Sequence, residues 1–154
     1  PTPKGDFLAL KEIADSSAEP IMADESLCTR EDAFRLVQMR ACDMFNVRLS
    51  KCGGIFRCLE IIKLAQEAGL GYQIGCHVGE SGILSATARH LVGIVSDTKY
   101  LEGSYSRIIL KEDVIYQDLT PREGIAFALN GLGLGIEVKE EVLRRYCQDS
   151  RLIS

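Results

Sequence analysis

The sequence predicts an α/β fold in which helices surround a parallel sheet. Segments typical of strands begin near residues 21, 44, 71 and 100, and each is flanked by one segment typical of a helix. This repeat of roughly 25 residues is the period of βα units. Two closures are compatible with it, an open doubly wound sheet or a (β/α)8 barrel. A complete barrel needs about 250 residues, so the 154 residues of this chain would form a partial one.

Four helices are expected around the strands, and their ends carry recognisable signals. Asp6 is an N-cap candidate for the first helix, and Thr29, with Asp32 three residues later, is one for the second. Gly69 is expected to end the third helix, because glycine tolerates the left-handed conformation found at helix C-termini. The expected helices cover residues 6–16, 29–41, 54–69 and 82–95.

One expected strand places a permanent cation inside the sheet. Apolar and polar residues alternate in this segment, which predicts that they point to opposite faces. The polar set, opposite Phe45 and Val47, comprises Asn46, Arg48 and Ser50. The expected strands cover residues 20–26, 44–50, 71–78 and 100–105.

The pattern changes after residue 106. Segments 107–117 and 124–129 are expected to form short antiparallel strands, and segment 138–148 a terminal helix. We therefore divide the chain into a barrel part, residues 1–106, and a tail, residues 107–154.

Composition excludes several classes of partner. The net charge is −4 and no basic stripe is present, which argues against nucleic acid. No apolar run approaches the length of a membrane span, and the start "PTPKGDF" is not a secretory signal. The six cysteines form no C-x-x-C pair, so we expect reduced thiols in a cytoplasmic protein. Because the first residues are Pro-Thr-Pro without Met, we expect that the chain begins inside a longer protein.

Charged residues gather where the expected strands end, and in both parallel architectures the active site lies at these carboxyl ends. Asp24 and Glu25 could bind a hard divalent cation, and Arg48 and Lys51 could hold an anion. Glu80 could be an acid, a base or an ion-pair partner. The four clusters are "ADES" (23–26), "RLSK" (48–51), "CHVGES" (76–81) and "LEGS" (101–104).

Several long segments resemble a known family. The chain is similar to the C-terminal half of an enolase-superfamily protein of the mandelate racemase/muconate lactonizing enzyme type, in its muconate cycloisomerase-like branch. The resemblance covers nearly the whole chain. It implies about four C-terminal βα units of a modified (β/α)7β barrel, and a tail that belongs to an α+β capping domain. The segments that carry it are "PIMADESLCTREDAFRL", "NVRLSKCGGIFRCLEIIKLAQEAGL", "GCHVGESGILSATARHL" and "GLGLGIEV".

The resemblance implies a reaction and a metal. Family members abstract a proton alpha to a carboxylate, and Mg²⁺ stabilises the resulting enolate. Asp24 matches the third of three metal-binding carboxylates, and Glu25 would orient it. Glu80 matches an acidic residue at the end of the seventh strand. The remaining metal ligands and a Lys-x-Lys pair of the family are absent, so this chain alone should bind Mg²⁺ weakly or not at all.

Three further residues are expected near the substrate. His77 lies near the end of the third expected strand, close to the expected site, and is a candidate substrate contact. In the family, residues at the end of the eighth strand contact substrate, and the resemblance places Glu102 and Ser104 there.

Arg48 occupies a position where the family usually has lysine. Lysine can act there as a second acid/base in racemases and epimerases, or as a cation that steadies the enolate. Arginine suits only the second role, because its side chain stays protonated at neutral pH. A one-base reaction is therefore favoured over racemisation. The alternative is a structural ion pair with Asp24. Lys51 matches a second family lysine and is expected to leave the strand on the face opposite Arg48.

Three functions remain open. The first is a fragment of a Mg²⁺-dependent lyase or isomerase that acts on a small-molecule carboxylate and is completed by the missing N-terminal half of the barrel and the cap. The second is a noncatalytic half-barrel, or a binding module that pairs with itself or with a partner. The third is a small open-sheet α/β ligand-binding protein. Unpaired strand edges also favour a homo-oligomer.

Overall fold

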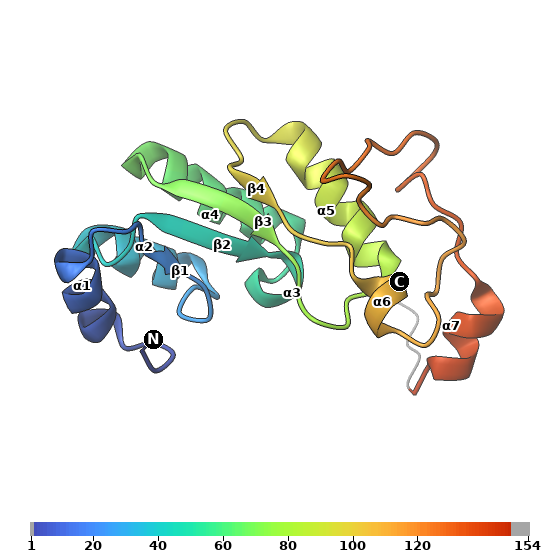
Figure 1. Ribbon diagram of the computed structural model, residues 1–154, viewed down its shortest axis with the longest axis horizontal. Coiled ribbons are helices and arrows are strands. Elements are labelled where there is room, and N and C mark those ends of the chain that lie inside the picture. The colour runs from blue at the N-terminus through green and yellow to red at the C-terminus, as the bar shows by residue number, and fades with distance from the viewer. Residues whose placement is uncertain (1, 149–154) are drawn as a thin grey trace. The chain divides into compact units, whose positions relative to one another are not determined.

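A computed structural model of the chain describes residues 2–148 (Figure 1). Its four strands form one fully parallel sheet, and their order in the sheet is their order in the chain. A doubly wound sheet reverses its strand order at a switch point, whereas a barrel continues in one direction. The observed order therefore favours a partial barrel over an open doubly wound sheet. The strands are β1 (Met22–Ala23), β2 (Met44–Arg48), β3 (Gly71–Gly75) and β4 (Tyr100–Leu101).

The expected capping signals are confirmed. Asp6 Oδ1 accepts a hydrogen bond from the Ala9 amide, and Thr29 forms a capping box with Asp32. Gly69 ends its helix with a left-handed conformation, at φ 71°. Helix α4 packs on β2 and β3, and α2 packs on α4. The helices around the strands are α1 (Phe7–Ser16), α2 (Arg30–Met39), α3 (Leu49–Cys52), α4 (Ile55–Ala68) and α5 (Gly82–Ile94).

The two faces of the sheet differ in chemistry. Strand alternation and the parallel register place one set of buried apolar side chains on the face that α4 covers. The opposite face carries the polar residues Asn46, Arg48 and Gln73, and the positions just beyond β1 and β4 continue it with Asp24 and Glu102. The buried apolar set is Ala23, Phe45, Val47, Tyr72 and Ile74.

Gly75 permits close approach on the polar face. It pairs with Arg48 in the sheet and is buried. A Cβ atom at this position would lie 2.0 Å from Asn46 Oδ1 and 3.0 Å from Glu102 Oε2. Asn46 is itself only 3% exposed, so its amide has little room to move away. The lack of a side chain at Gly75 therefore lets polar groups from β2 and β4 approach β3.

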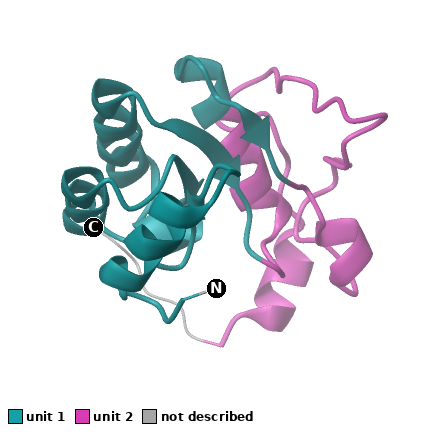
Figure 2. Cartoon of the chain, turned by 60° about the vertical axis from the view of Figure 1, so that its left-hand side comes forward, with its two compact units in different colours: residues 1–77, 91–102 teal, residues 78–90, 103–154 magenta. Residues whose placement is uncertain are grey.

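The chain divides into two compact units (Figure 2). The first unit contains residues 1–77 and 91–102, and so includes the sheet. The second contains residues 78–90 and 103–154, and its buried centre is Ala86, Ile115 and Leu119.

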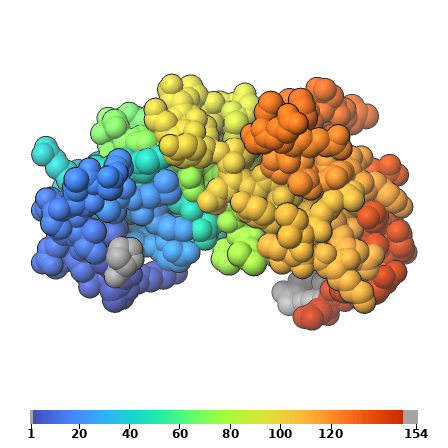
Figure 3. Space-filling view, viewed as in Figure 1, coloured from blue at the N-terminus to red at the C-terminus, as the bar shows by residue number. Residues whose placement is uncertain are grey.

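The tail differs from its predicted secondary structure. Residues 106–109 form a short helix, α6 (Ser106–Ile109). The prediction of a strand over 107–117 is therefore wrong for its first three residues. No strand forms at 124–129 either; the described tail has only the isolated antiparallel bridges Ile115–Val138 and Arg122–Ile125. Its apolar side chains instead form one cluster with the part of α5 in this unit. Figure 3 shows parts of the tail, coloured orange to red, on the visible surface.

The terminal helix is confirmed as α7 (Glu140–Tyr146). Residue 1 of the expected barrel part and residues 149–154 of the expected tail lie outside the described residues. Within residues 2–148, no helix has the length and apolar character needed to cross a membrane.

Replacement of Gly75 by alanine should destabilise the protein. The new methyl group would collide with the buried Asn46 amide, and overpacking of this kind costs about 1–3 kcal/mol in the free energy of unfolding. The control is Gly93→Ala in α5, where a Cβ would meet no atom within 4 Å. Because alanine favours helix, Gly93→Ala should be neutral or stabilising by up to about 1 kcal/mol. Urea unfolding of both variants measures the difference, and equal stabilities would contradict the packing argument.

Candidate functional site

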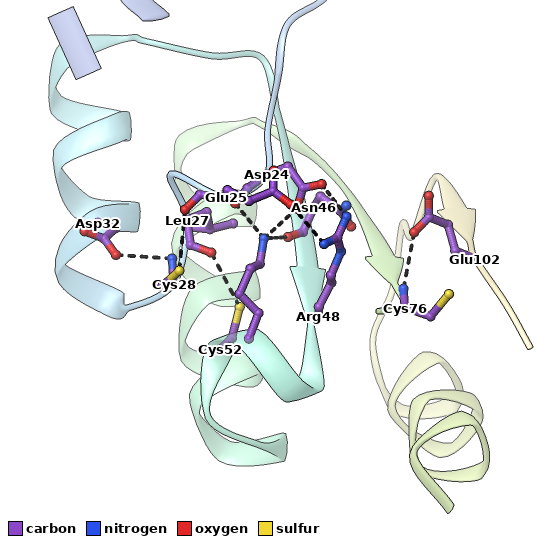
Figure 4. A network of polar contacts seen from close by, with 11 residues as sticks. Asp24, Glu25, Leu27, Cys28, Asp32, Asn46, Arg48, Cys52, Cys76 and Glu102 are labelled. Carbon is purple, nitrogen blue, oxygen red and sulfur yellow. Dashed lines mark hydrogen bonds and ion pairs between the residues drawn. The ribbon is translucent and has the colours of Figure 1, made fainter. Parts of the chain in front are cut away.

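The carboxyl ends of β1 and β2 bring four charged residues together (Figure 4). Ala23 pairs with Phe45. Asp24, which follows Ala23, therefore lies beside Asn46. Arg48 is the last residue of β2, on the same face. The register of two parallel strands therefore places a carboxylate and a guanidinium at the same edge of the sheet.

Arg48 pairs with two carboxylates. Its Nη2 forms a short ion pair with Asp24 Oδ2, and its Nη1 lies 3.2 Å from Glu25 Oε1. The Arg48 side chain is 14% exposed and that of Asp24 is 28% exposed. The ion pair of Arg48 with Asp24 is thus present. The Nε atom of Arg48 is buried and has no hydrogen-bond acceptor among the described residues.

Lys51 also converges on Asp24. Its ammonium lies 2.6 Å from the Asp24 carbonyl oxygen, 2.8 Å from Asp24 Oδ1 and 2.9 Å from the Asn46 carbonyl oxygen. An ammonium has three N–H groups, so these three acceptors use all of them. The Lys51 side chain is only 8% exposed. We refer to Asp24, Glu25, Arg48 and Lys51 as the strand-end ion cluster.

The expectation that Lys51 points away from Arg48 is wrong. It assumed that strand alternation continues to residue 51, but β2 ends at Arg48 and α3 begins at Leu49. In a helical turn, successive side chains rotate by about 100° rather than 180°. Lys51 is therefore turned back toward β1, and both cations reach the same carboxylate.

The strand-end ion cluster borders a cavity of about 320 Å³. The cavity also includes His77, which follows β3 and is exposed. The structure therefore places His77 together with Glu25, Arg48 and Lys51. The residues that line the cavity are Lys4, Glu25, Cys28, Arg48, Ser50, Lys51 and His77.

Three further predicted residues do not line this cavity. Glu102 follows β4, and its Oε2 accepts a hydrogen bond from the Cys76 amide at 3.2 Å. Glu80 lies in the loop between β3 and α5 and is half-buried. Ser104 is buried, and its hydroxyl bonds those of Ser85 and Ser106 at 2.9 and 3.1 Å. Glu80 and Ser104 belong to the second unit, whereas the ion cluster and Glu102 belong to the first.

Sequence analysis missed two residues of the cavity, Lys4 and Cys28. Lys4 reaches it because the Gly5 amide donates to Ser26 Oγ at 3.2 Å, which holds the N-terminal segment beside the end of β1. No local pattern indicates that long-range bond. Cys28 lies four residues after Asp24, in the loop that enters α2, where proximity along the chain was an available signal.

The donor set fits Mg²⁺ only as part of a larger site. Carboxylate oxygens are the ligands that Mg²⁺ prefers, and Asp24 and Glu25 provide them. Within residues 2–148, however, no group of three or more His, Cys, Asp or Glu side chains is placed to hold an ion. A carboxylate offers about four lone-pair sites. Arg48 and Lys51 therefore leave lone pairs of Asp24 with which it could bind a metal ion. Asp24 could therefore contribute one ligand among others.

Removal of the Lys51 ammonium should destabilise the protein. Lys51→Met removes a charged donor from two carbonyl oxygens and one carboxylate oxygen, although the Asp24 carbonyl keeps the Leu27 amide as a donor. A hydrogen bond to a charged group contributes about 1.5–3 kcal/mol. We expect a loss of about 2–3 kcal/mol in the free energy of unfolding. The matched control is Lys11→Met, which removes an exposed helix pair with Asp15 and should cost less than about 0.5 kcal/mol. Equal effects in urea unfolding would contradict a structural role for Lys51.

Comparison with known proteins supplies the family. A family model described as "Enolase C-terminal domain-like" matches residues 1–142. A D-Ala-D/L-Ala epimerase from Cytophaga hutchinsonii is 37% identical over 140 residues, which cover 91% of this chain and 35% of the epimerase. The chain thus spans little more than a third of that relative's length.

Solved structures agree with the fold. The 2-chloromuconate cycloisomerase from Rhodococcus opacus 1CP is 30% identical, with a TM-score of 0.83 over 94% of this chain and 39% of that one. A dipeptide epimerase from Cytophaga hutchinsonii, complexed with Mg and the dipeptide D-Ala-L-Val, is 33% identical. Its TM-score is 0.81 over 90% of this chain and 38% of that one. The chain is therefore a partial barrel and belongs to the mandelate racemase/muconate lactonizing enzyme group of the enolase superfamily, in its C-terminal domain.

Proposed function

We propose that this chain supplies part of the active site of a Mg²⁺-dependent isomerase or lyase that removes a proton alpha to a carboxylate. The observation that carries the proposal is the strand-end ion cluster, at the carboxyl ends of β1 and β2 in a chain of this superfamily. Active sites of barrel enzymes lie at this end of their strands. Muconate cycloisomerase-like chemistry is the closest match to the residues present.

Asp24 is the residue that would hold the metal, and Glu25 would orient it through Arg48, which contacts both carboxylates. When bound, Mg²⁺ supplies positive charge that lowers the free energy of an enolate. Lys51 fixes Asp24 from the opposite side through Oδ1 and the backbone carbonyl. This support pre-organises the carboxylate, so less reorganisation is needed on binding.

Arg48 is proposed to hold an anion rather than to accept a proton. A guanidinium stays protonated at neutral pH, so it can neutralise a substrate carboxylate or an enolate but is not a base. The relatives include both an epimerase and a cycloisomerase. Arginine at this position favours a one-base reaction of the cycloisomerase kind over a two-base one.

The other predicted residues keep subsidiary roles in the proposal. Glu80 would act as an acid or order the site, and His77, Glu102 and Ser104 would contact the substrate or support residues that do. His77 has the strongest support, because it borders the same cavity as Arg48 and Lys51.

The proposed partners are a small-molecule carboxylate, the rest of the barrel with its cap, and further copies of the protein. The buried reduced thiols of Cys42, Cys52 and Cys58 support a cytoplasmic location.

A noncatalytic association module is the second candidate. Its support is the open sheet, in which β1 and β4 each pair with a single neighbour among the described strands. Unpaired edges of this kind favour addition of another strand. This candidate needs neither a metal nor a substrate.

The 154-residue chain alone should show no turnover. Asp24 is a single ligand, so we expect weak or undetectable Mg²⁺ binding by titration calorimetry. We also expect no Mg²⁺-dependent deuterium exchange into D-Ala-L-Val, the dipeptide bound by one relative. The longer protein that contains the chain should bind Mg²⁺ at least about tenfold more tightly, and Asp24→Asn should weaken that binding. Mg²⁺-dependent exchange by the chain alone would contradict the proposal, and a longer protein that binds no Mg²⁺ would favour the association module.

The full-length protein should exchange the alpha proton of one enantiomer only. Its Arg48→Lys variant should gain exchange of the opposite enantiomer, because lysine can be tuned to act as a base and arginine cannot. Nuclear magnetic resonance in D₂O follows both exchange rates. Exchange of both enantiomers of one substrate by the unmodified protein would refute the one-base assignment.

A further inference from the structure

A second cavity, of about 400 Å³, lies within the second unit, and the proposed reaction uses none of its residues. Its walls come from α5 and from two segments of the tail, all of which belong to this unit (Figure 2). The volume falls in the range of about 300–1,000 Å³ that is typical of small-molecule pockets. We refer to it as the tail cavity; its lining includes Arg89, Asp118, Leu119, Arg122, Phe127 and Leu129.

Hydrogen bonds within the unit hold the walls of the tail cavity in place. The Arg89 guanidinium donates to the Leu119 carbonyl oxygen and, at 2.8 Å, to the Phe127 carbonyl oxygen, so one side chain of α5 fixes both tail segments. Arg122 lies at the base of a tight turn, where its backbone exchanges two hydrogen bonds with that of Ile125, at 3.0 and 2.8 Å. Little further ordering is therefore needed for a ligand to bind.

The tail cavity has an excess of positive charge. Neither Arg89 nor Arg122 forms an ion pair with another residue of the described chain, and the acceptors of Arg89 are neutral carbonyl oxygens. Asp118 instead pairs with Arg107, whose Nε lies 3.1 Å from Asp118 Oδ1. Arg89 is also half-buried, so part of its charge has lost hydration without gaining a counterion.

Apolar side chains form another part of the wall. Leu119 is 3% exposed, and Leu129 packs against the buried cluster that contains Leu119. Phe127 is 64% exposed, so much of its ring remains available for contact. Burial of an apolar group against this ring would be favourable, because aromatic side chains offer a large apolar area. The tail cavity thus combines cations with an apolar wall.

We propose that the tail cavity binds a small organic anion, namely a carboxylate or a phosphate ester that carries an apolar or aromatic group. The guanidinium of Arg122, joined by that of Arg89, would hold the anionic oxygens, because parallel N–H groups match carboxylate and phosphate geometry. A guanidinium has five N–H groups, and the two carbonyl oxygens occupy only part of the set on Arg89. Phe127 and Leu129 would contact the apolar group. This inference does not depend on the proposed reaction.

Titration of the isotope-labelled 154-residue chain at pH 7 and low salt, followed by nuclear magnetic resonance, tests the site. The probes are phenylacetate, its neutral analogue phenylacetamide, acetate and phenyl phosphate. We expect phenylacetate to shift the amide signals of residues 117–129 saturably. Acetate and phenylacetamide should each bind about three- to fivefold more weakly, because each lacks one of the two contacts.

Three variants assign the contacts. Arg122→Gln should weaken phenylacetate binding about three- to fivefold, because it removes the charge but no hydrogen bond of the folded chain. Phe127→Ala should weaken phenylacetate binding but leave acetate binding unchanged, since only the apolar contact is lost. Arg144→Gln is the matched control, because it removes the same charge from an 80% exposed side chain in α7. It should leave every affinity unchanged.

The outcomes separate the tail cavity from other anion sites. Shifts confined to residues 48–51 would place the anion at the strand-end ion cluster and overturn the proposal. An equal loss of affinity in Arg122→Gln and Arg144→Gln would overturn it too, because the attraction would then depend on net charge alone. The absence of saturable shifts with every probe would show that Arg122 is only a solvated surface cation. Tighter binding of phenyl phosphate than of phenylacetate would support phosphate esters as the ligands, and the reverse order would support carboxylates.

Discussion

The strand-end ion cluster is the interaction on which this part of the barrel depends. Strand β1 contributes only Met22 and Ala23 to the ladder, so backbone pairing alone gives it a weak connection to β2. The Lys51 ammonium extends that connection, because it bonds the Asp24 carbonyl on one strand and the Asn46 carbonyl on the other. Partial burial strengthens these bonds, and the opposite charges of Asp24 and Lys51 offset the cost of removing each from water. The same side chain thus joins two strands and orients a candidate metal ligand.

The polar face of the sheet follows from a second constraint, which is space. Gly75 leaves room for the Asn46 amide from β2 and for Glu102 at the end of β4. In this space, Glu102 Oε2 accepts a hydrogen bond from the Cys76 amide. This bond fixes the chain just after β3. Polar side chains from β2 and from the end of β4 therefore come close together over β3 at this edge of the sheet. The apolar residues of the same strands point the other way, under α4, so the cost of crowding polar groups is offset by the core behind them.

Local signals predicted most of the first unit. Asp6, Thr29 and Gly69 act at the helix ends where the sequence places them, since capping depends on residues only a few positions apart. The direction of Lys51 was not predictable from alternation, because the change from strand to helix at Leu49 carries no local marker. Strands in the tail were wrongly predicted for a related reason. Its apolar residues pack on α5, and a packing partner distant in sequence leaves no local periodicity.

Arg48 and Lys51 both hold Asp24, but in different ways. Arg48 spans Asp24 and Glu25 with separate nitrogens, which the fork of a guanidinium can do and a single ammonium cannot do as well. Lys51 has all three N–H groups committed to acceptors, so its nitrogen has no lone pair directed at a substrate. Neither cation is therefore arranged to take a proton. In the proposed reaction, the base has to be a different residue, and the strand-end ion cluster contributes charge and position to the site.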